Sequence, residues 1–321
     1  MSQKRFFLPW LFPVYQRVSL ARFLLWQSMF LTEQGLRYLI LELLHGNVEQ
    51  ITFVRQGIRW TVYAGDQSVG MPLFYLDDFD RPNAQVLLAW IRAHGRLPHR
   101  ETIVEIGANI GSSTIPLLQG TGCRLLSIEP VPRNRELLEL NLKQNGLASR
   151  VKIIPCAIAD DDEMVKMIVP LHALGGSELE KRPLDNPESH FSSPCENVTV
   201  QAMRLDKLLE REQIAPAEVE FVWSDTQGSE GAVIRTGAPL WETGVPLWVE
   251  IEPLLLARQD SLERFLADAA RYFAFYIPSS ALQAQGVDAP RVPIAALPEL
   301  VRSVLGTHTD VLLLPRQSSI A

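Results

Sequence analysis

The stretch VEIGANIGSSTIPLL, residues 104–118, constrains the fold of this 321-residue chain more than any other segment. It has the pattern of a hydrophobic strand, a turn that contains Gly107 and Gly111, and a helix that opens on Ser-Ser-Thr. Glycines close to a helix N-terminus let a large or anionic ligand approach the backbone, because they have no side chain to fill that space. The segment therefore predicts a site for a nucleotide-like cofactor.

Strand and helix patterns alternate from about residue 101 onward, which indicates a mostly parallel sheet covered by helices on both faces. Five strands are expected over 102–106, 124–128, 151–158, 218–223 and 247–251. Two further strands near the C-terminus bring the expected number to seven. In an open α/β sheet the ligand lies at the carboxyl ends of the strands. The loops after the first, second, fourth and fifth strands are therefore expected to line one cleft.

Glu129 follows Gly107 by 22 residues and ends the second predicted strand. An acidic side chain at this place accepts hydrogen bonds from both ribose hydroxyls of an adenosine. The dinucleotide fingerprint G-x-G-x-x-G is not matched, because Asn109 stands where the second glycine would be and would crowd a pyrophosphate. S-adenosylmethionine fits better, since it has no phosphate and brings an amino-acid carboxylate to the helix N-terminus.

Composition limits the classes of function that remain. The chain is 47% hydrophobic and 21% charged, which is globular, and its net charge of −7 argues against a protein that coats nucleic acid. Three cysteines without disulfide or zinc spacing favour a reducing, cytoplasmic compartment. No transmembrane segment is expected, because the longest apolar stretch, residues 18–31, is shorter than the ~20 residues that span a bilayer.

Residues 1–100 are expected to form an extension ahead of a catalytic domain over 101–321. A helical region over 16–45, a hairpin around Gly57 and a helix that ends at Gly95 are expected within it. The apolar residues 1–45 either pack against the protein or a second subunit, or offer a peripheral contact to the inner face of a membrane or to a lipid-linked acceptor. The segment 170–198 lacks periodicity and is expected to be a substrate loop or a mobile one.

Six segments in the same order make the chain resemble the FkbM-type methyltransferases, a branch of the class I S-adenosylmethionine-dependent enzymes, from about residue 57 to the C-terminus. The segments are VEIGANIGSSTIPL, SIEPVPRNRELLELNLKQNGL, VKIIPCAIAD, VTVQAMRLDKLL, SDTQGSEGAVIRTGA and LWVEIEP. The resemblance implies a Rossmann-like class I methyltransferase fold. It also implies an O-methyltransferase whose acceptor is a hydroxyl of a sugar, glycolipid, polysaccharide or secondary metabolite, and it suggests that residues 157–160 line the adenine pocket.

The cofactor is expected to meet the backbone around Asn109 with its methionine moiety and Glu129 with its ribose. Thr114 either contacts the carboxylate or is a plain residue of the helix face. The residues expected to bind the cofactor are Glu105, Gly107, Ala108, Asn109, Gly111, Thr114, Glu129, Pro130, Ala157, Asp160 and Asp225.

Methyl transfer from a sulfonium needs an acceptor oxygen held in line with the methyl group and a base for its proton. Asp225 is the first candidate for the base, and Glu230 or Glu250 comes next. Helix capping for Glu230 and a buried structural pair for Glu250 are equally open. No histidine is spaced as a metal ligand and no metal site is expected. A divalent ion held by the oxygens of Asp225 and Glu250 remains an alternative.

The fourth-strand motif departs from the family pattern. The family reads K-I-D-V-E-G-x-E, whereas residues 223–230 read WSDTQGSE, so that Gln227 replaces an acid and Ser224 replaces an apolar residue. The departure motivates a second hypothesis, a non-catalytic protein that binds S-adenosylmethionine. A third is a nicotinamide-dependent oxidoreductase, which shares the strand, the glycine turn and the acid but not the second glycine.

Overall fold

The computed structural model describes residues 37, 40, 48–75, 79–94, 101–180 and 193–316. The helical region expected over 16–45 lies outside these residues, apart from Arg37 and Ile40, which are helical. Gly95, the expected end of a helix, lies outside them as well. In the part of the chain that is described, no helix is both long and apolar enough to cross a membrane.

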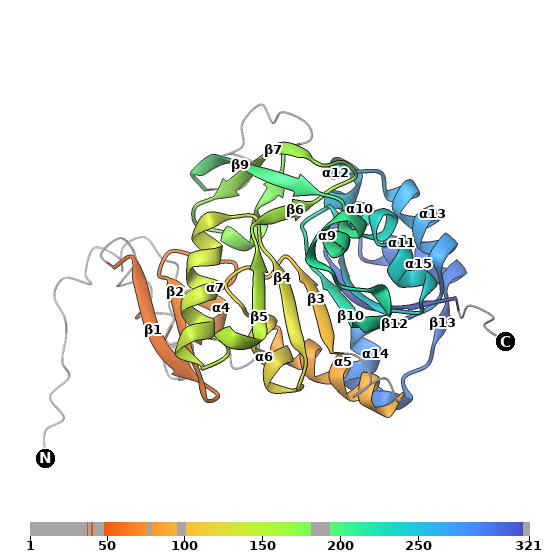
Figure 1. The fold of residues 1–321 in the computed structure, drawn as a ribbon, viewed down its shortest axis with the longest axis horizontal. Coiled ribbons are helices and arrows are strands. Elements are labelled where there is room, and N and C mark those ends of the chain that lie inside the picture. The colour runs from red at the N-terminus through yellow and green to blue at the C-terminus, as the bar shows by residue number, and fades with distance from the viewer. Residues whose placement is uncertain are drawn as a thin grey trace, which may run out of the picture.

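An eight-stranded sheet forms the centre of the fold, in the order β13-β12-β14-β11-β10-β3-β4-β5 (Figure 1). The strands are β3 (Thr102–Ile106), β4 (Arg124–Ile128), β5 (Val151–Ile154), β10 (Val219–Ser224), β11 (Leu247–Ile251), β12 (Phe273–Pro278), β13 (Val292–Pro293) and β14 (Thr309–Pro315). β3, β4, β5, β10 and β11 run parallel, and β14 is inserted antiparallel between β11 and β12. The α/β fold with a mostly parallel sheet is as predicted. The additional strand, β13, was not predicted. It has only two residues, lies at the edge of the sheet and contains a proline, so the sequence shows no strand pattern there.

The single strand expected over 151–158 is wrong. Pro155 separates β5 from β6 (Cys156–Ile158), which belongs to a different, four-stranded sheet in the order β6-β9-β7-β8. Proline has no N–H to donate to a ladder, so the chain leaves the main sheet at this residue. The second sheet also contains β7 (Glu163–Pro170), β8 (Glu178–Leu179) and β9 (Cys195–Met203). Part of the segment 170–198 therefore has regular structure, and the second sheet continues from the carboxyl end of β5 (Figure 1).

Helices cover both faces of the central sheet, and alternate side chains of each strand enter two different cores. In β3, Ile103 belongs to one core, and Val104 and Ile106 belong to the other. The first core includes residues of α5 (Arg81–Ala93), α6 (Thr114–Gln119), α7 (Pro132–Gln144) and α14 (Ser279–Gln285). The second includes residues of α9 (Leu205–Glu212), α10 (Glu230–Thr236), α11 (Ala238–Glu242), α12 (Pro253–Gln259), α13 (Leu262–Tyr272) and α15 (Leu297–Ser303). This layering leaves the carboxyl ends of the strands free to form a site.

Local signals in the sequence explain the helix α7. Pro132 occupies its first turn, where a missing N–H costs nothing, and Gly146, with φ of +70°, follows its end. Leu137, Leu138 and Leu142 are buried on one side of the helix. The sequence predicted this helix with both of its ends.

The predicted hairpin is present as β1 (Gln50–Arg55) and β2 (Ile58–Tyr63), which are antiparallel and joined by Gln56 and Gly57. Both turn residues have positive φ, which is the geometry of a tight hairpin turn. Asn141 of α7 exchanges two hydrogen bonds with the backbone of Thr61, at 2.7 and 3.1 Å, and Trp60 enters the first core. The hairpin and α4 (Gly70–Tyr75) thus lie against the body of the protein. The division into 1–100 and 101–321 stays a prediction.

Candidate active site

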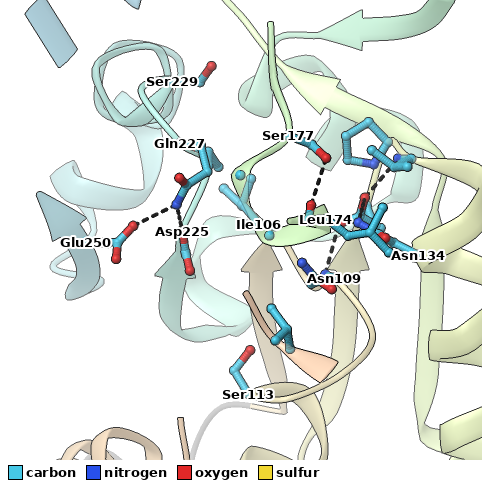
Figure 2. A pocket seen from close by; sticks show the side chains of 18 of the residues that line it. Ile106, Asn109, Ser113, Asn134, Leu174, Ser177, Asp225, Gln227, Ser229 and Glu250 are labelled. Atoms are coloured by element: carbon cyan, nitrogen blue, oxygen red, sulfur yellow. Dashed lines mark hydrogen bonds between the residues drawn. The ribbon is translucent and has the colours of Figure 1, made fainter. Parts of the chain in front are cut away.

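A cavity of about 550 Å³ lies at the carboxyl ends of the parallel strands (Figure 2). Its volume is within the roughly 300–1,000 Å³ that is usual for small-molecule sites. Residues that follow β3, β4 and β10 line it together with residues at the end of β11: Gly107, Glu129, Asp225, Glu250 and Glu252. The structure thus brings together the four loops that the sheet topology predicted to share one cleft.

The turn after β3 contains Gly107 because another backbone segment crosses there. Gly107 has φ of +86°, and a Cβ on it would lie 1.7 Å from the carbonyl oxygen of Asp225. The close approach is therefore made by the loop after β10 and not by a ligand. Asn109, with φ of +49°, lines the cavity and donates its backbone N–H to Glu129 Oε2 at 2.8 Å.

Glu129 is buried at the end of β4, and both of its oxygens accept hydrogen bonds. Oε2 accepts from Asn109, and Oε1 accepts from the backbone N–H of Val131 at 2.8 Å and from Asn134 Nδ2 at 3.3 Å. Burial raises the pKa of Glu129 to about 7, although these donors oppose the increase. Each carboxylate oxygen has two lone pairs, so Oε2 can still accept one further hydrogen bond, such as that of a ribose hydroxyl.

Two amide oxygens of the cavity wall are buried without a hydrogen-bond donor, Asn109 Oδ1 and Asn134 Oδ1. A buried hydrogen-bond acceptor without a donor raises the free energy of the folded protein, and a ligand that supplies donors removes this penalty. S-adenosylmethionine brings an ammonium group, two ribose hydroxyls and the adenine amine. With Glu129 between the two asparagines, the residues of this end fit the cofactor that the sequence analysis expected.

The opposite wall of this end comes from the second sheet. Ala157 lines it from β6, and the segment from Ala173 to Leu179 lines it from the β7–β8 connection. Buried Asp66 holds that segment in place, since it accepts the backbone N–H groups of Leu174 at 3.1 Å and of Gly70 at 2.8 Å. Sequence reasoning missed this wall, because Asp66 and Leu174 are 108 positions apart.

The other end of the cavity is acidic. Asp225 and Glu250 line it from β10 and β11, and four residues that sequence reasoning did not single out join them: Asp80, Glu252, His308 and Asp310. Burial raises the pKa of Asp80 to about 7 and that of Asp310 to about 6. Burial, and then the charge of Asp225, raise the pKa of Glu250 well above its ordinary value. Asp80 and Asp310 therefore exchange protons near neutral pH.

The structure does not place all the expected cofactor residues in the cavity wall. Glu105 is fully buried and accepts hydrogen bonds from the hydroxyls of Ser113, Thr114 and Ser127, each at 2.7 Å. Glu105 and Thr114 thus join β3, β4 and α6 to one another. The residues expected at the cofactor that do not line the cavity are Glu105, Ala108, Gly111, Thr114 and Asp160. Glu105 and Ala108 are fully buried, and Gly111 faces Leu138.

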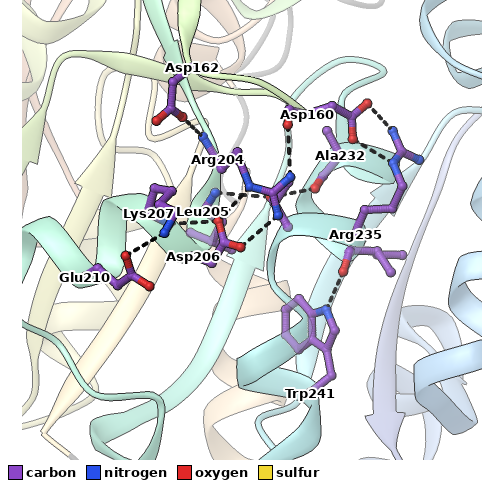
Figure 3. Close-up of polar contacts among 12 residues, drawn as sticks. Asp160, Asp162, Arg204, Leu205, Asp206, Lys207, Glu210, Ala232, Arg235 and Trp241 are labelled. Atoms are coloured by element: carbon purple, nitrogen blue, oxygen red, sulfur yellow. Dashed lines mark hydrogen bonds and ion pairs between the residues drawn. The ribbon is translucent and has the colours of Figure 1, made fainter.

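Asp160 faces an ion-pair cluster instead of the adenine region. Arg235 of α10 binds both of its oxygens, Nε to Oδ1 and Nη2 to Oδ2, each at 2.7 Å (Figure 3). The same guanidinium also contacts Asp260 at 2.7 Å and Asp268 at 3.1 Å. Asp160 therefore ties the second sheet to α10, which is a structural role.

Glu230, one of the three candidate bases, does not line the cavity either. Its buried carboxylate accepts from the backbone N–H of Thr226 at 3.0 Å, the hydroxyl of Thr226 at 2.8 Å and the N–H of Gly228 at 3.0 Å. These bonds fix the loop between β10 and α10. These contacts therefore favour a local structural role for Glu230 over the role of general base. Asp225 and Glu250 remain as candidates for the base.

In the described part of the chain, no group of three or more His, Cys, Asp or Glu side chains is arranged to hold a metal ion. Between Asp225 and Glu250 lies the carboxamide of Gln227 (Figure 2).

Comparison with known proteins gives the family. The methyltransferase FkbM domain matches residues 105–267, which is half of the chain. The chain has no match among curated proteins. Similar solved structures include an O-methyltransferase from Bacillus cereus in complex with S-adenosylhomocysteine (13% identity, 75% of this chain and 93% of that chain, TM-score 0.39). Another is a geranyl diphosphate methyltransferase in complex with sinefungin (13% identity, 77% and 82%, TM-score 0.40).

These structural similarities concern the arrangement of the chain and say nothing of the acceptor. The family assignment rests on the domain match, which begins within β3 and ends within α13 and so includes the strand-turn-helix segment, Glu129 and the Asp225 loop. The chain belongs to the FkbM methyltransferases, and it is an S-adenosylmethionine-dependent methyltransferase.

Proposed function

We propose that the protein transfers the methyl group of S-adenosylmethionine to a hydroxyl oxygen of an acceptor that binds at the acidic end of the cavity. The cofactor supplies an electrophilic methyl group on a positively charged sulfur. The contribution of the chain is to hold the acceptor oxygen in line with that group and to take its proton. The observation that carries the proposal is the pair Asp225 and Glu250, which lines the cavity beside the Gly107 turn.

Asp225 is the proposed base. It follows β10 directly, and its backbone N–H bonds to Ile106 O at 3.0 Å, which keeps it next to the cofactor turn. As the acceptor oxygen forms its bond to the methyl carbon, the carbon–sulfur electron pair goes to sulfur and the hydroxyl proton goes to the Asp225 carboxylate. Glu250, whose pKa is raised by burial and by the charge of Asp225, stays protonated more readily and donates a hydrogen bond to the acceptor.

The charge of the cavity supports an acceptor without negative charge. Among the described lining residues there are six carboxylic acids and no Lys or Arg: Asp80, Glu129, Asp225, Glu250, Glu252 and Asp310. A phosphate or carboxylate would be repelled by this wall, whereas hydroxyl groups donate to it. A sugar, a glycolipid, a polysaccharide or a hydroxylated secondary metabolite satisfies this requirement.

A lipid-linked acceptor, a peripheral membrane contact and a homo-oligomer are all proposals that depend on residues 1–45. That segment lies outside the described residues apart from Arg37 and Ile40. Deletion of residues 1–45 should weaken the binding of such an acceptor and leave cofactor affinity unchanged. Loss of a dimer in the same variant would assign the segment to subunit contact instead.

The test is a screen with S-adenosylmethionine labelled in its methyl group against neutral sugars, glycolipids and phosphorylated sugars, with products read by mass spectrometry. We expect label on a hydroxyl oxygen of a neutral acceptor. Asp225→Asn should reduce turnover by about 10²- to 10⁴-fold, as expected for loss of a general base, and keep affinity for S-adenosylhomocysteine. The exposed Asp161→Asn is the matched control and should behave as the wild type.

Label on nitrogen or carbon would contradict the proposal, as would undiminished turnover in Asp225→Asn. Cofactor binding with no turnover on any acceptor would favour the alternative of a non-catalytic binding protein. The nicotinamide-dependent alternative is not supported by the family match.

A further inference from the structure

Gln227 has an unusual place in the cavity wall. It lies in the loop between β10 and α10, and its amide nitrogen donates one hydrogen bond to Asp225 Oδ1 and another to Glu250 Oε2, each at 2.9 Å (Figure 2). Both hydrogens of the nitrogen are therefore used on carboxylates that come from neighbouring strands. A single neutral group thus joins the two proposed acid-base residues.

The orientation of this amide follows from electrostatics. With the amide oxygen turned inward, three oxygen atoms that carry negative charge would face one another, whereas the NH₂ group gives each carboxylate a donor. A cation placed between two carboxylates would stand where this nitrogen stands. Divalent ions require six or more oxygen ligands at about 2.0–2.6 Å, and the hydrogens of the NH₂ group occupy that space.

The backbone holds Gln227 in this position. Gln227 and Gly228 both have positive φ, +53° and +99°, and a Cβ on Gly228 would lie 2.7 Å from Gln259 Cγ. Glu230 accepts the N–H of Gly228 and fixes the same loop. Several contacts thus fix the conformation of the loop. In this conformation the side chain of Gln227 is directed at the two carboxylates.

We propose that Gln227 is a positioning residue of the methyl-transfer site, whose amide nitrogen holds Asp225 and Glu250 together and takes the place of a cation between them. The proposal rests on the proposed roles of the two carboxylates. It predicts that the residue at 227 decides whether the site uses a metal ion. With Gln it works through hydrogen bonds alone, and with a third carboxylate it would need protons or a cation to neutralise the repulsion.

Other charged groups face this pair from every element around it, and they add to the same field. They are Asp80 before α5, Glu230 of α10, Glu252 before α12, and His308 and Asp310 at the start of β14. His308 Nε2 lies 3.8 Å from Glu250 Oε1 and is exposed, so its charge is well screened by water. The amide of Gln227 is the donor that contacts both members of the pair.

The experiment is a titration of the full-length protein with Mn²⁺ in three forms: wild type, Gln227→Glu and Gln213→Glu. Gln213 is a matched control, because it is also a glutamine with positive φ, is exposed and lies away from the cavity. We expect Gln227→Glu to bind one Mn²⁺ at least about tenfold more tightly than the other two, since it supplies a third carboxylate ligand. Affinity for S-adenosylhomocysteine confirms that each variant is folded.

A second readout uses the charge of the cofactor. The sulfonium of S-adenosylmethionine is attracted by an ionised pair, whereas the neutral sulfur of S-adenosylhomocysteine is not. Gln227→Met removes both N–H donors but keeps a side chain of similar size, so the two carboxyl groups should ionise at a higher pH. The ratio of the affinity for S-adenosylmethionine to that for S-adenosylhomocysteine should therefore begin to rise at a higher pH than in the wild type. A purely structural role of Gln227 would lower both affinities together without moving that pH.

Tight Mn²⁺ binding by the wild type would overturn the proposal, and so would a folded Gln227→Glu that binds Mn²⁺ no better than Gln213→Glu. An unchanged pH dependence in Gln227→Met would do the same. None of these measurements needs an acceptor. Failure of the proposed O-methyltransferase function would appear separately, as label on another atom or as no turnover in the acceptor screen.

Discussion

Titration with S-adenosylhomocysteine at a series of pH values examines the contact between Glu129 and the ribose. Burial raises the pKa of this carboxyl group to about 7 in the free protein. Ribose hydroxyls donate to the ionised form, so binding of the ligand favours loss of the proton. The affinity should therefore rise with pH until Glu129 is ionised without the ligand and then become constant. S-adenosylhomocysteine is the suitable probe because its sulfur is uncharged and is indifferent to the acidic end of the cavity.

The magnitude follows from linkage. If the bound ligand returns the pKa of Glu129 to its ordinary value of 4.5, affinity changes by about tenfold per pH unit below 7. Between about pH 8 and pH 5 the dissociation constant should increase roughly 100-fold, which is about 2.7 kcal/mol. Calorimetry in two buffers of different ionisation enthalpy should count about one proton released near pH 6 and none above about pH 8.

Two variants separate Glu129 from the other titrating groups. Glu129→Gln should bind weakly at every pH, because a single amide oxygen cannot accept a ribose hydroxyl in addition to the N–H groups that bind Glu129, and its affinity should not depend on pH. Glu139→Gln, an exposed glutamate on α7, should keep the wild-type profile. A wild-type affinity that is independent of pH, or a pH dependence that survives in Glu129→Gln, would refute the reasoning.

Three further substitutions test the framework of the site. Arg235→Leu removes the guanidinium that contacts three buried or half-buried aspartates and leaves Arg264, at 3.9 Å from two of them, as a weaker partner, so the free energy of unfolding in urea should fall by about 3–5 kcal/mol while the folded fraction keeps its ligand affinity. Gly107→Ala places a methyl group 1.7 Å from a carbonyl oxygen and should abolish calorimetric binding, whereas Gly122→Ala, which meets nothing within 4 Å, should bind normally. Asp66→Ala removes the acceptor of two buried N–H groups, one of them on Leu174 in the cavity wall, and should cost about 1–3 kcal/mol per group and weaken S-adenosylhomocysteine binding.

Local signals in the sequence predicted one side of the cofactor end of the cavity. The glycine turn, the acid 22 residues later and the ends of α7 are each defined by residues close in the chain. The parallel order of the strands then fixes which loops meet, so Asp225 and Glu250 could be placed in the same cleft as Gly107 and Glu129. Residues at the ends of strands are predictable in this way because the sheet sets their position.

Long-range contacts account for what the sequence did not show. Asn83 Nδ2 donates to Asp310 Oδ2 across 227 positions, and both line the acidic end. Asp160 was assigned to the adenine region from the family resemblance, but Arg235, 75 positions later, binds its side chain. Glu105 was expected to bind the cofactor, yet its side chain accepts hydrogen bonds from the hydroxyls of Ser113, Thr114 and Ser127. Neither position alone nor residue type reveals such partners.

A crystal structure of the protein with S-adenosylhomocysteine bound tests most directly whether this cavity is the methyl-transfer site. We expect the ribose hydroxyls to donate to Glu129, the buried amide oxygens of Asn109 and Asn134 to accept from the ligand, and the sulfur to face Asp225. A ligand bound outside the cavity, or one whose ribose lies away from Glu129 and whose sulfur faces neither Asp225 nor Glu250, would contradict the assignment.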